Sequence, residues 1–155
     1  MENEEETRYF IDQSWYKTAG RSFSAMALSR VCASCKSKLG TEKEERVPVA
    51  NPQTGKVTFE LRKVTYGANP LVVIRDCCSS AKDYTTPHMP IMEIVFRIFL
   101  ANANQPLTLE ELRQQIEERA NVSQSGRYVT AQTLERLIKD DRFYGIRPIV
   151  IPPAL

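Results

Sequence analysis

The sequence predicts an α+β protein with two small parts, one containing a short antiparallel sheet and one containing three helices. Apolar and polar residues alternate over residues 57–61, as in a half-buried strand, whereas apolar residues from Pro90 onward recur at helical spacing. The length of 155 residues suits one ordinary domain or two small ones. A content of 42% hydrophobic and 26% charged residues is typical of a globular protein and argues against global disorder.

The first predicted part covers residues 9–80 and follows an acidic start, residues 1–8, that we expect to be frayed. Its aromatic residues near the N-terminus, including Trp15 and Tyr16, are expected to anchor the N-terminal arm on the protein. Expected elements are a capped helix, a mobile loop rich in charge and turn residues, and two short strands. These elements are placed at residues 22–30, 41–55, 57–61 and 71–74.

The second predicted part covers residues 90–155 and is joined to the first by a proline-containing linker, residues 81–89. Thr108 and Glu111 have the spacing of a capping box, and Thr130 is placed to cap the next helix. Three amphipathic helices and a closing strand are expected, at residues 90–102, 108–120, 130–140 and 143–150.

All four cysteines fall into two tight clusters, Cys32 with Cys35 and Cys77 with Cys78. The acidic N-terminus lacks the basic and then apolar pattern of a secretory signal, so the expected compartment is the cytosol. Thiols stay reduced there and bind metal more often than they form disulfides. We therefore predict a structural Zn2+ site with these four cysteines as ligands, because a closed tetrahedral site leaves no position for water or substrate.

The ligand set has alternatives at the second cluster. Cys32 and Cys35, followed by Gly40, resemble a zinc knuckle, but a zinc ribbon would carry a second C-x-x-C where this chain has adjacent cysteines. Two adjacent cysteines reach one metal only if the backbone turns sharply between them. The other ligand set replaces one of them with His88, the sole histidine. Metal-free buried thiols and bound iron are the remaining alternatives.

The order and length of the elements in residues 90–151 resemble the winged helix-turn-helix family. The resemblance implies that the third helix, residues 130–140, enters the major groove of DNA and that the turn at Tyr144 and Gly145 forms the wing. The residues that would then contact DNA are Arg127, Gln132, Thr133, Arg136, Lys139 and Arg147.

The charge pattern leaves two functions open. The formal net charge is +2, and acidic and basic residues balance within residues 90–155, so no basic face for phosphate is evident. The sequence contains no known catalytic motif and no apolar run long enough to span a membrane, so neither an enzyme with a small-molecule substrate nor a membrane protein is expected. The leading prediction is a small cytosolic, zinc-containing, DNA-binding regulator of transcription. The alternative is a zinc-stabilised adaptor or complex subunit that binds a protein partner, which an exposed apolar patch beside a third helix of mixed charge would favour.

Overall fold

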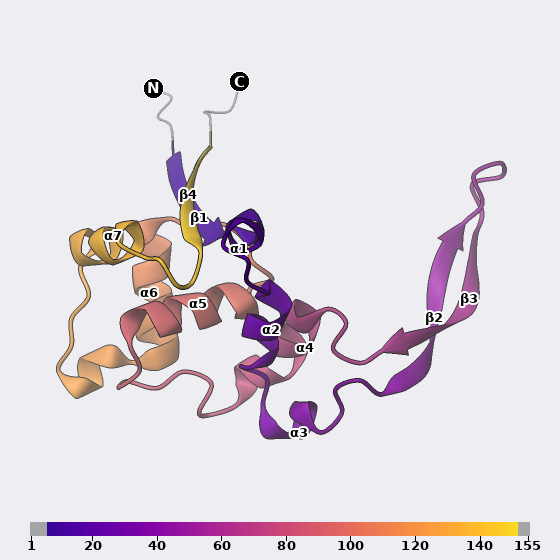
Figure 1. Cartoon of the computed structure of the whole chain (residues 1–155), viewed down its shortest axis with the longest axis horizontal. Helices are drawn as coiled ribbons and strands as arrows, with labels where there is room; N and C mark the ends of the chain where they lie inside the picture. The colour runs from indigo at the N-terminus through magenta and orange to yellow at the C-terminus, as the bar shows by residue number, and fades with distance from the viewer. Residues whose placement is uncertain (1–5, 152–155) are drawn as a thin grey trace.

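The computed structural model describes residues 6–151 and has an α+β architecture, with a body of helices, a small sheet at the chain ends and a projecting hairpin (Figure 1). The helices are α1 (Gln13–Thr18), α2 (Phe23–Leu28), α3 (Ala33–Lys36), α4 (Pro70–Asp76), α5 (Ile91–Ala101), α6 (Leu109–Ala120) and α7 (Ala131–Lys139), with 3-10 turns η1 (Cys78–Ser80) and η2 (Val122–Ser125). The strands are β1 (Glu6–Ile11), β2 (Glu42–Ala50), β3 (Val57–Thr65) and β4 (Ile146–Ile151).

The three predicted C-terminal helices are confirmed as α5, α6 and α7. The capping box of α6 is formed, because the Glu111 N–H donates to Thr108 Oγ1 at 3.2 Å and the Thr108 N–H donates to Glu111 Oε1 at 3.1 Å. Thr130 caps α7 in the same way by accepting from the Thr133 N–H at 3.1 Å. Helix α5 is buried on most of its surface and forms the centre of the core.

The two ends of the chain meet in a sheet. Strand β1 pairs antiparallel with β4, from Glu6 opposite Ile151 to Ile11 opposite Ile146, and Figure 1 shows the two strands side by side. The Tyr9 N–H also donates to the Leu107 carbonyl at 2.7 Å, which forms an isolated bridge between β1 and the loop that joins α5 to α6. The expectation of a frayed end is therefore wrong for residues 6–8, since the ladder supplies their backbone partners. Residues 1–5 lie outside the described residues.

The two predicted parts share one hydrophobic core. Ile11 and Tyr16 from the N-terminal segment are buried in the same cluster as Ile94 and Leu134. The Tyr16 hydroxyl donates to the Tyr144 carbonyl at 2.5 Å, which fastens the predicted aromatic anchor to the C-terminal segment. The predicted linker also contributes, because Tyr84 is only 4% exposed. The body therefore stabilises both parts together, and the β2–β3 hairpin extends away from it (Figure 1).

Three local predictions in the first part are wrong. The strand predicted at residues 57–61 forms as part of β3, but all five residues are exposed and not half-buried, because the hairpin projects away from the body. The predicted strand at residues 71–74 is the middle of helix α4, which begins with Pro70 and buries Val73 and Ile74. A short apolar run does not distinguish a strand from one turn of a buried helix, and here the proline at the first helical position favours the helix. The predicted mobile loop at residues 41–55 is instead strand β2 and its turn, because β2 pairs with β3 along its whole length.

Candidate metal centre

Three cysteine thiols meet beside the base of the hairpin. The sulfur atoms of Cys32, Cys35 and Cys78 lie within 4.8 Å of one another, and Cys35 and Cys78 are buried. Zinc–sulfur bonds of ~2.3 Å place tetrahedral thiolates roughly 3.8 Å apart, so small side-chain movements would close these sulfurs on an ion. The cluster could therefore hold a metal ion.

The first two ligands are placed by a tight turn. Cys32 precedes helix α3, and its carbonyl accepts hydrogen bonds from the N–H groups of Cys35 at 3.1 Å and Lys36 at 2.9 Å. The Cys32 N–H in turn donates to the sulfur of Cys78 at 3.2 Å. Backbone and side chain thus join two segments of the chain that are 46 residues apart.

Cys77 lies at a break in the backbone between α4 and η1. Its φ of −134° and ψ of −64° are not helical, so the chain turns sharply between the two adjacent cysteines. The Cys77 side chain is exposed and lies outside the close three-sulfur cluster. Interactions with the side chains of Cys35 and Cys32 raise the pKa of Cys77 to about 11. The backbone thus turns at Cys77, but the close cluster contains three sulfurs and not four.

The thiols of the cluster differ in their readiness to ionise. The hydrogen bond from the Ser34 hydroxyl, 3.3 Å from the Cys32 sulfur, and the Cys35 N–H lower the pKa of Cys32 to about 6. Burial has the opposite effect on Cys78 and raises its pKa to about 12. In the metal-free protein Cys32 thus loses its proton more readily than Cys77 or Cys78, and an ion must displace the protons of the latter two in order to bind them.

Tyr66 is a site residue that the sequence analysis missed. Its hydroxyl donates to the Cys35 sulfur at 3.2 Å, and this hydrogen bond raises the pKa of Tyr66 to about 12. The backbone fixes its position, since the Tyr66 carbonyl accepts from Gly40 at 3.1 Å and its N–H donates to Thr41 at 2.7 Å. Such donors orient a ligand and tune its basicity. No spacing in the sequence marks this residue, because it approaches the cysteines only through pairing at the hairpin base.

His88, the alternative ligand, is exposed and, like Cys77, does not belong to the close cluster of possible ligands. Cys77 differs from His88 in that it directly precedes the cluster residue Cys78 in the chain and interacts with the side chains of Cys35 and Cys32.

The six residues predicted to contact DNA divide into two groups. Gln132, Arg136 and Lys139 are exposed on α7, and Thr133 is half-buried within the cap of that helix. These side chains share the exposed surface of α7 with Glu135 and with its C-cap, Asp140, so the charge there is mixed.

Arg127 and Arg147 are half-buried and engaged within the protein. Arg127 donates to the Pro87 carbonyl and to Ser125 Oγ, the latter at 3.3 Å. Arg147 donates to the Ile146 carbonyl at 2.7 Å, and its guanidinium lies 3.6 Å from the buried carboxylate of Asp141. Both side chains stabilise turns of the fold, which leaves less of their charge for phosphate.

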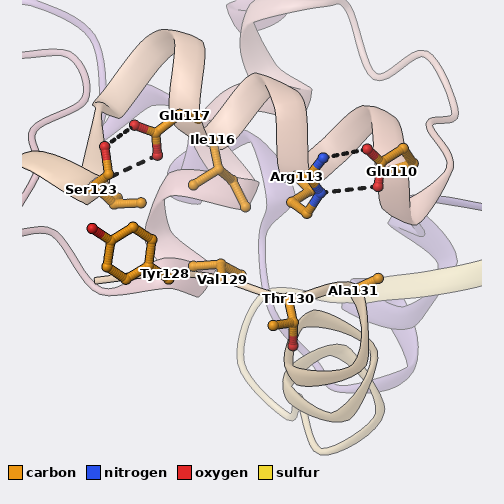
Figure 2. A pocket seen from close by; sticks show the side chains of 10 residues that line it. Glu110, Arg113, Ile116, Glu117, Ser123, Tyr128, Val129, Thr130 and Ala131 are labelled. Atoms are coloured by element: carbon orange, nitrogen blue, oxygen red, sulfur yellow. Dashed lines mark hydrogen bonds and ion pairs between the residues drawn. The ribbon is translucent and has the colours of Figure 1, made fainter. Parts of the chain in front are cut away.

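A groove of about 660 Å3 lies between α6 and the segment leading into α7. Figure 2 shows two pairs of polar side chains in it, an ion pair of Arg113 with Glu110 and a hydrogen-bonded pair of Ser123 with Glu117. The Arg113 Nε donates to Glu110 Oε2 at 3.0 Å, and the Ser123 N–H donates to the Glu117 carboxylate at 3.4 Å. Both carboxylates are therefore engaged by neighbours, Glu110 by an arginine and Glu117 by the hydroxyl and N–H of a serine.

The β2–β3 hairpin, called the ribbon below, exposes a row of apolar side chains. Val57, Phe59 and Leu61 are 58%, 62% and 67% exposed, and they alternate along β3 so that they share one face. Their partners on β2 include Pro48 and Ala50, which are also exposed. These five residues are the apolar face of the ribbon, and Figure 1 shows the ribbon projecting away from the helices.

No protein-family model, curated protein or solved structure matches the chain. Within residues 6–151, no helix combines the length and the apolar character needed to cross a membrane. Three features of the described residues bear on function, namely the thiol cluster, the exposed surface of α7 and the apolar face of the ribbon.

Proposed function

We propose that this protein is a zinc-stabilised interaction module that binds another protein through the apolar face of the ribbon. The observation that carries the proposal is the exposure of Val57, Phe59 and Leu61 on one face of a projecting hairpin. Contiguous exposed apolar patches mark interaction sites, and an isolated two-stranded hairpin is only marginally stable in water. A partner that covers this face would remove the apolar surface from water and stabilise the hairpin.

The proposed metal is Zn2+, held by Cys32, Cys35, Cys77 and Cys78. The donor set supports it, because four thiolates in a reducing compartment such as the cytosol suit tetrahedral zinc. The role of the ion is structural, since a closed site leaves no position for substrate. Both strands of the ribbon begin or end next to this centre, so the ion would hold the ribbon at a defined angle to the body.

Metal content measured on the purified, reduced protein tests the site. We expect stoichiometric zinc in the wild type and in His88→Ala, and loss of zinc in Cys77→Ser and in Cys78→Ser. Retention of zinc in Cys77→Ser together with its loss in His88→Ala would replace the four-cysteine site with the histidine-containing one. Purification of the reduced wild type without any metal would reject the site altogether.

Affinity capture from extracts of the source cells, followed by quantitative mass spectrometry, tests the interaction surface. A Phe59→Ser/Leu61→Ser variant should lose a partner that the wild type retains, because both side chains are large and exposed. The matched control is Arg136→Ala/Lys139→Ala, which changes two exposed residues of α7 and should retain the partner. Loss of the same partner from the control and not from the ribbon variant would move the surface to α7.

A second candidate function is DNA binding through α7. The exposure of Gln132, Arg136 and Lys139 favours it, as does the arrangement of three helices beside a sheet to which Leu107, β1 and β4 contribute. Fluorescence anisotropy with duplex DNA over a series of salt concentrations tests it. Under this hypothesis Arg136→Ala/Lys139→Ala should weaken binding and reduce the dependence on salt by about two phosphate contacts.

A further inference from the structure

We infer that the ribbon pairs with a second copy of this chain, β3 against β3 and antiparallel, to form a four-stranded sheet across a two-fold axis. The inference rests on the proposed function, in which the ribbon is an interaction surface, and it names one partner of that surface.

Only one edge of the ribbon is suited to accept a strand. In a two-stranded sheet each strand has a free edge, and β2 contains Pro48 together with a run of charged residues at Glu42–Arg46. Proline and dense charge are the features by which proteins protect sheet edges from pairing. Strand β3, with the sequence VTFELRKVT, has no proline and is rich in β-branched and aromatic residues. The free edge of β3 is therefore the one that can accept another strand.

Among axes at residues 59–62, in the middle of β3, the charges favour one register. In a two-fold antiparallel pair, residues at equal distances on either side of the axis lie opposite each other and share a face. An axis at Leu61 places Glu60 opposite Arg62 of the second copy, and the symmetry repeats this ion pair. An axis at Glu60 or at Arg62 would place like charges opposite each other. An axis at Phe59 would place Lys56 opposite Arg62, which is also repulsive.

The same register brings the apolar faces of the two ribbons together. Leu61 meets Leu61 of the second copy at the axis, and Phe59 lies diagonal to that leucine and opposite Lys63. A cation opposite an aromatic ring is a favourable pair. A sheet of three or more strands with an apolar face is stable where a two-stranded ribbon is marginal, so pairing would stabilise the ribbon and double its apolar face.

Glu60 and Arg62 are well placed to form ion pairs with the second copy in place of the ion pair that they form within one chain. Within one chain they form an ion pair at 3.6 Å, with side chains 56% and 60% exposed. An ion pair so exposed contributes little to the fold, and Glu60 lies opposite the uncharged Val47, so reversing the charge of Glu60 should leave the monomer intact. Arg62 lies opposite Glu45 in the same ribbon, so Arg62→Glu would also place like charges opposite each other within one chain, and Glu60→Arg is the cleaner test of the interface.

Sedimentation analysis of the full chain loaded with zinc, over a wide range of concentration, tests the inference. The wild type should form a species of twice the 17.7 kDa chain mass. Glu60→Arg and Arg62→Glu should each weaken the dimer by about tenfold or more, because each places two like-charge pairs across the axis. The double variant Glu60→Arg/Arg62→Glu should restore the dimer, since opposite charges again face each other. Circular dichroism of each variant confirms that the chain is folded.

Three results would overturn the inference. The first is a wild type that stays monomeric at every concentration, and the second is a dimer that Glu60→Arg leaves unchanged. The third is a double variant that remains as weak as the single ones. The capture experiment separates this inference from the proposed function. If the wild type is monomeric but still captures a partner through Phe59, the pairing with a second copy is wrong and the proposed function stands. If the dimer forms and responds to the charge changes but the apolar face captures no other protein, the pairing stands and the proposed role as an adaptor is wrong.

Discussion

Replacing Glu93 with glutamine should destabilise the fold strongly, because Glu93 joins helix α5 to the segment after α2. Its carboxylate accepts from Arg30 at 2.7 and 3.0 Å and from Arg97 at 3.0 Å. The side chains of Arg30, Glu93 and Arg97 are only 10%, 17% and 20% exposed. The Tyr144 hydroxyl also donates to this carboxylate at 3.3 Å. One side chain thus links three segments of the body.

The size of the effect follows from what glutamine leaves behind. Glu93→Gln keeps the shape of the side chain but leaves two poorly solvated guanidinium groups without an opposite charge. Breaking a buried ion pair costs about 3–5 kcal/mol in the free energy of unfolding. Arg30 and Arg97 keep hydrogen bonds to carbonyls at 2.8 Å, so the lower figure applies. A loss of about 3 kcal/mol corresponds to a melting temperature lowered by roughly 6–12 °C.

Urea unfolding followed by circular dichroism, with equal zinc in all samples, measures this loss. The matched control is Glu110→Gln, which removes the carboxylate of an arginine pair whose side chains are 58% and 42% exposed. Loss of that exposed pair should lower the free energy of unfolding by less than about 1 kcal/mol. Equal losses in the two variants would refute the reasoning, because burial would then make no difference to the value of the pair.

Lowering the pH should reduce the difference in unfolding free energy between the wild type and Glu93→Gln. Burial alone would raise the pKa of Glu93, but the hydrogen bonds and charges of Arg30 and Arg97 outweigh burial and lower it below 4.5. The stabilisation is therefore fully present above the ordinary glutamate pKa and is lost as the pH falls through the lowered value. A difference in unfolding free energy that stayed constant into strong acid would contradict this assignment.

Three further outcomes are expected. Tyr66→Phe removes the hydroxyl that donates to Cys35 and should weaken zinc binding by about tenfold in a competition titration with a chromophoric chelator. Unchanged affinity would show that the Tyr66 hydroxyl does not affect Cys35 as a zinc ligand. In the same titration, affinity should rise from mildly acidic to mildly alkaline pH, because Cys77 and Cys78, with pKa values of about 11 and 12, must lose protons; a flat profile would argue against thiolate ligands. Gly145→Ala should lower the free energy of unfolding in urea by at least about 1 kcal/mol more than Gly126→Ala does. Both glycines have a positive φ, but only at Gly145 would a Cβ lie 2.8 Å from the Tyr16 ring. Equal losses in the two variants would show that this contact is tolerated.

Local signals predicted much of the C-terminal segment. The capping box at Thr108, the cap at Thr130 and the helical spacing of apolar residues predicted α5, α6 and α7 close to their observed bounds. These signals succeed because caps and amphipathic spacing act over three or four residues, within a single element. The sequence likewise predicted that Cys32 and Cys35 lie close to Cys78. This prediction needed no knowledge of the fold, because a metal site brings several thiolates together whatever the path of the chain between them.

Other features depended on partners distant in the sequence. Residues 6–8 form a strand only because β4 lies beside them, and Leu71–Ile74 form a helix because one side of that run is buried under the body. Tyr66 reaches the thiol of Cys35 because the hairpin base pairs it with Thr41. None of these contacts leaves a mark within a short window of sequence.

The sequence by itself thus determined the α+β class, the three C-terminal helices and the cysteines that could bind a metal, because propensity, caps and ligand chemistry belong to individual residues. Only the tertiary structure decided which charges are free. It committed Arg127 and Arg147 to carbonyls and to Asp141, left the surface of α7 with mixed charge, and exposed Phe59 and its neighbours on a projecting ribbon. Exposure and pairing are properties of the packed chain, since they depend on which surfaces face each other across the fold.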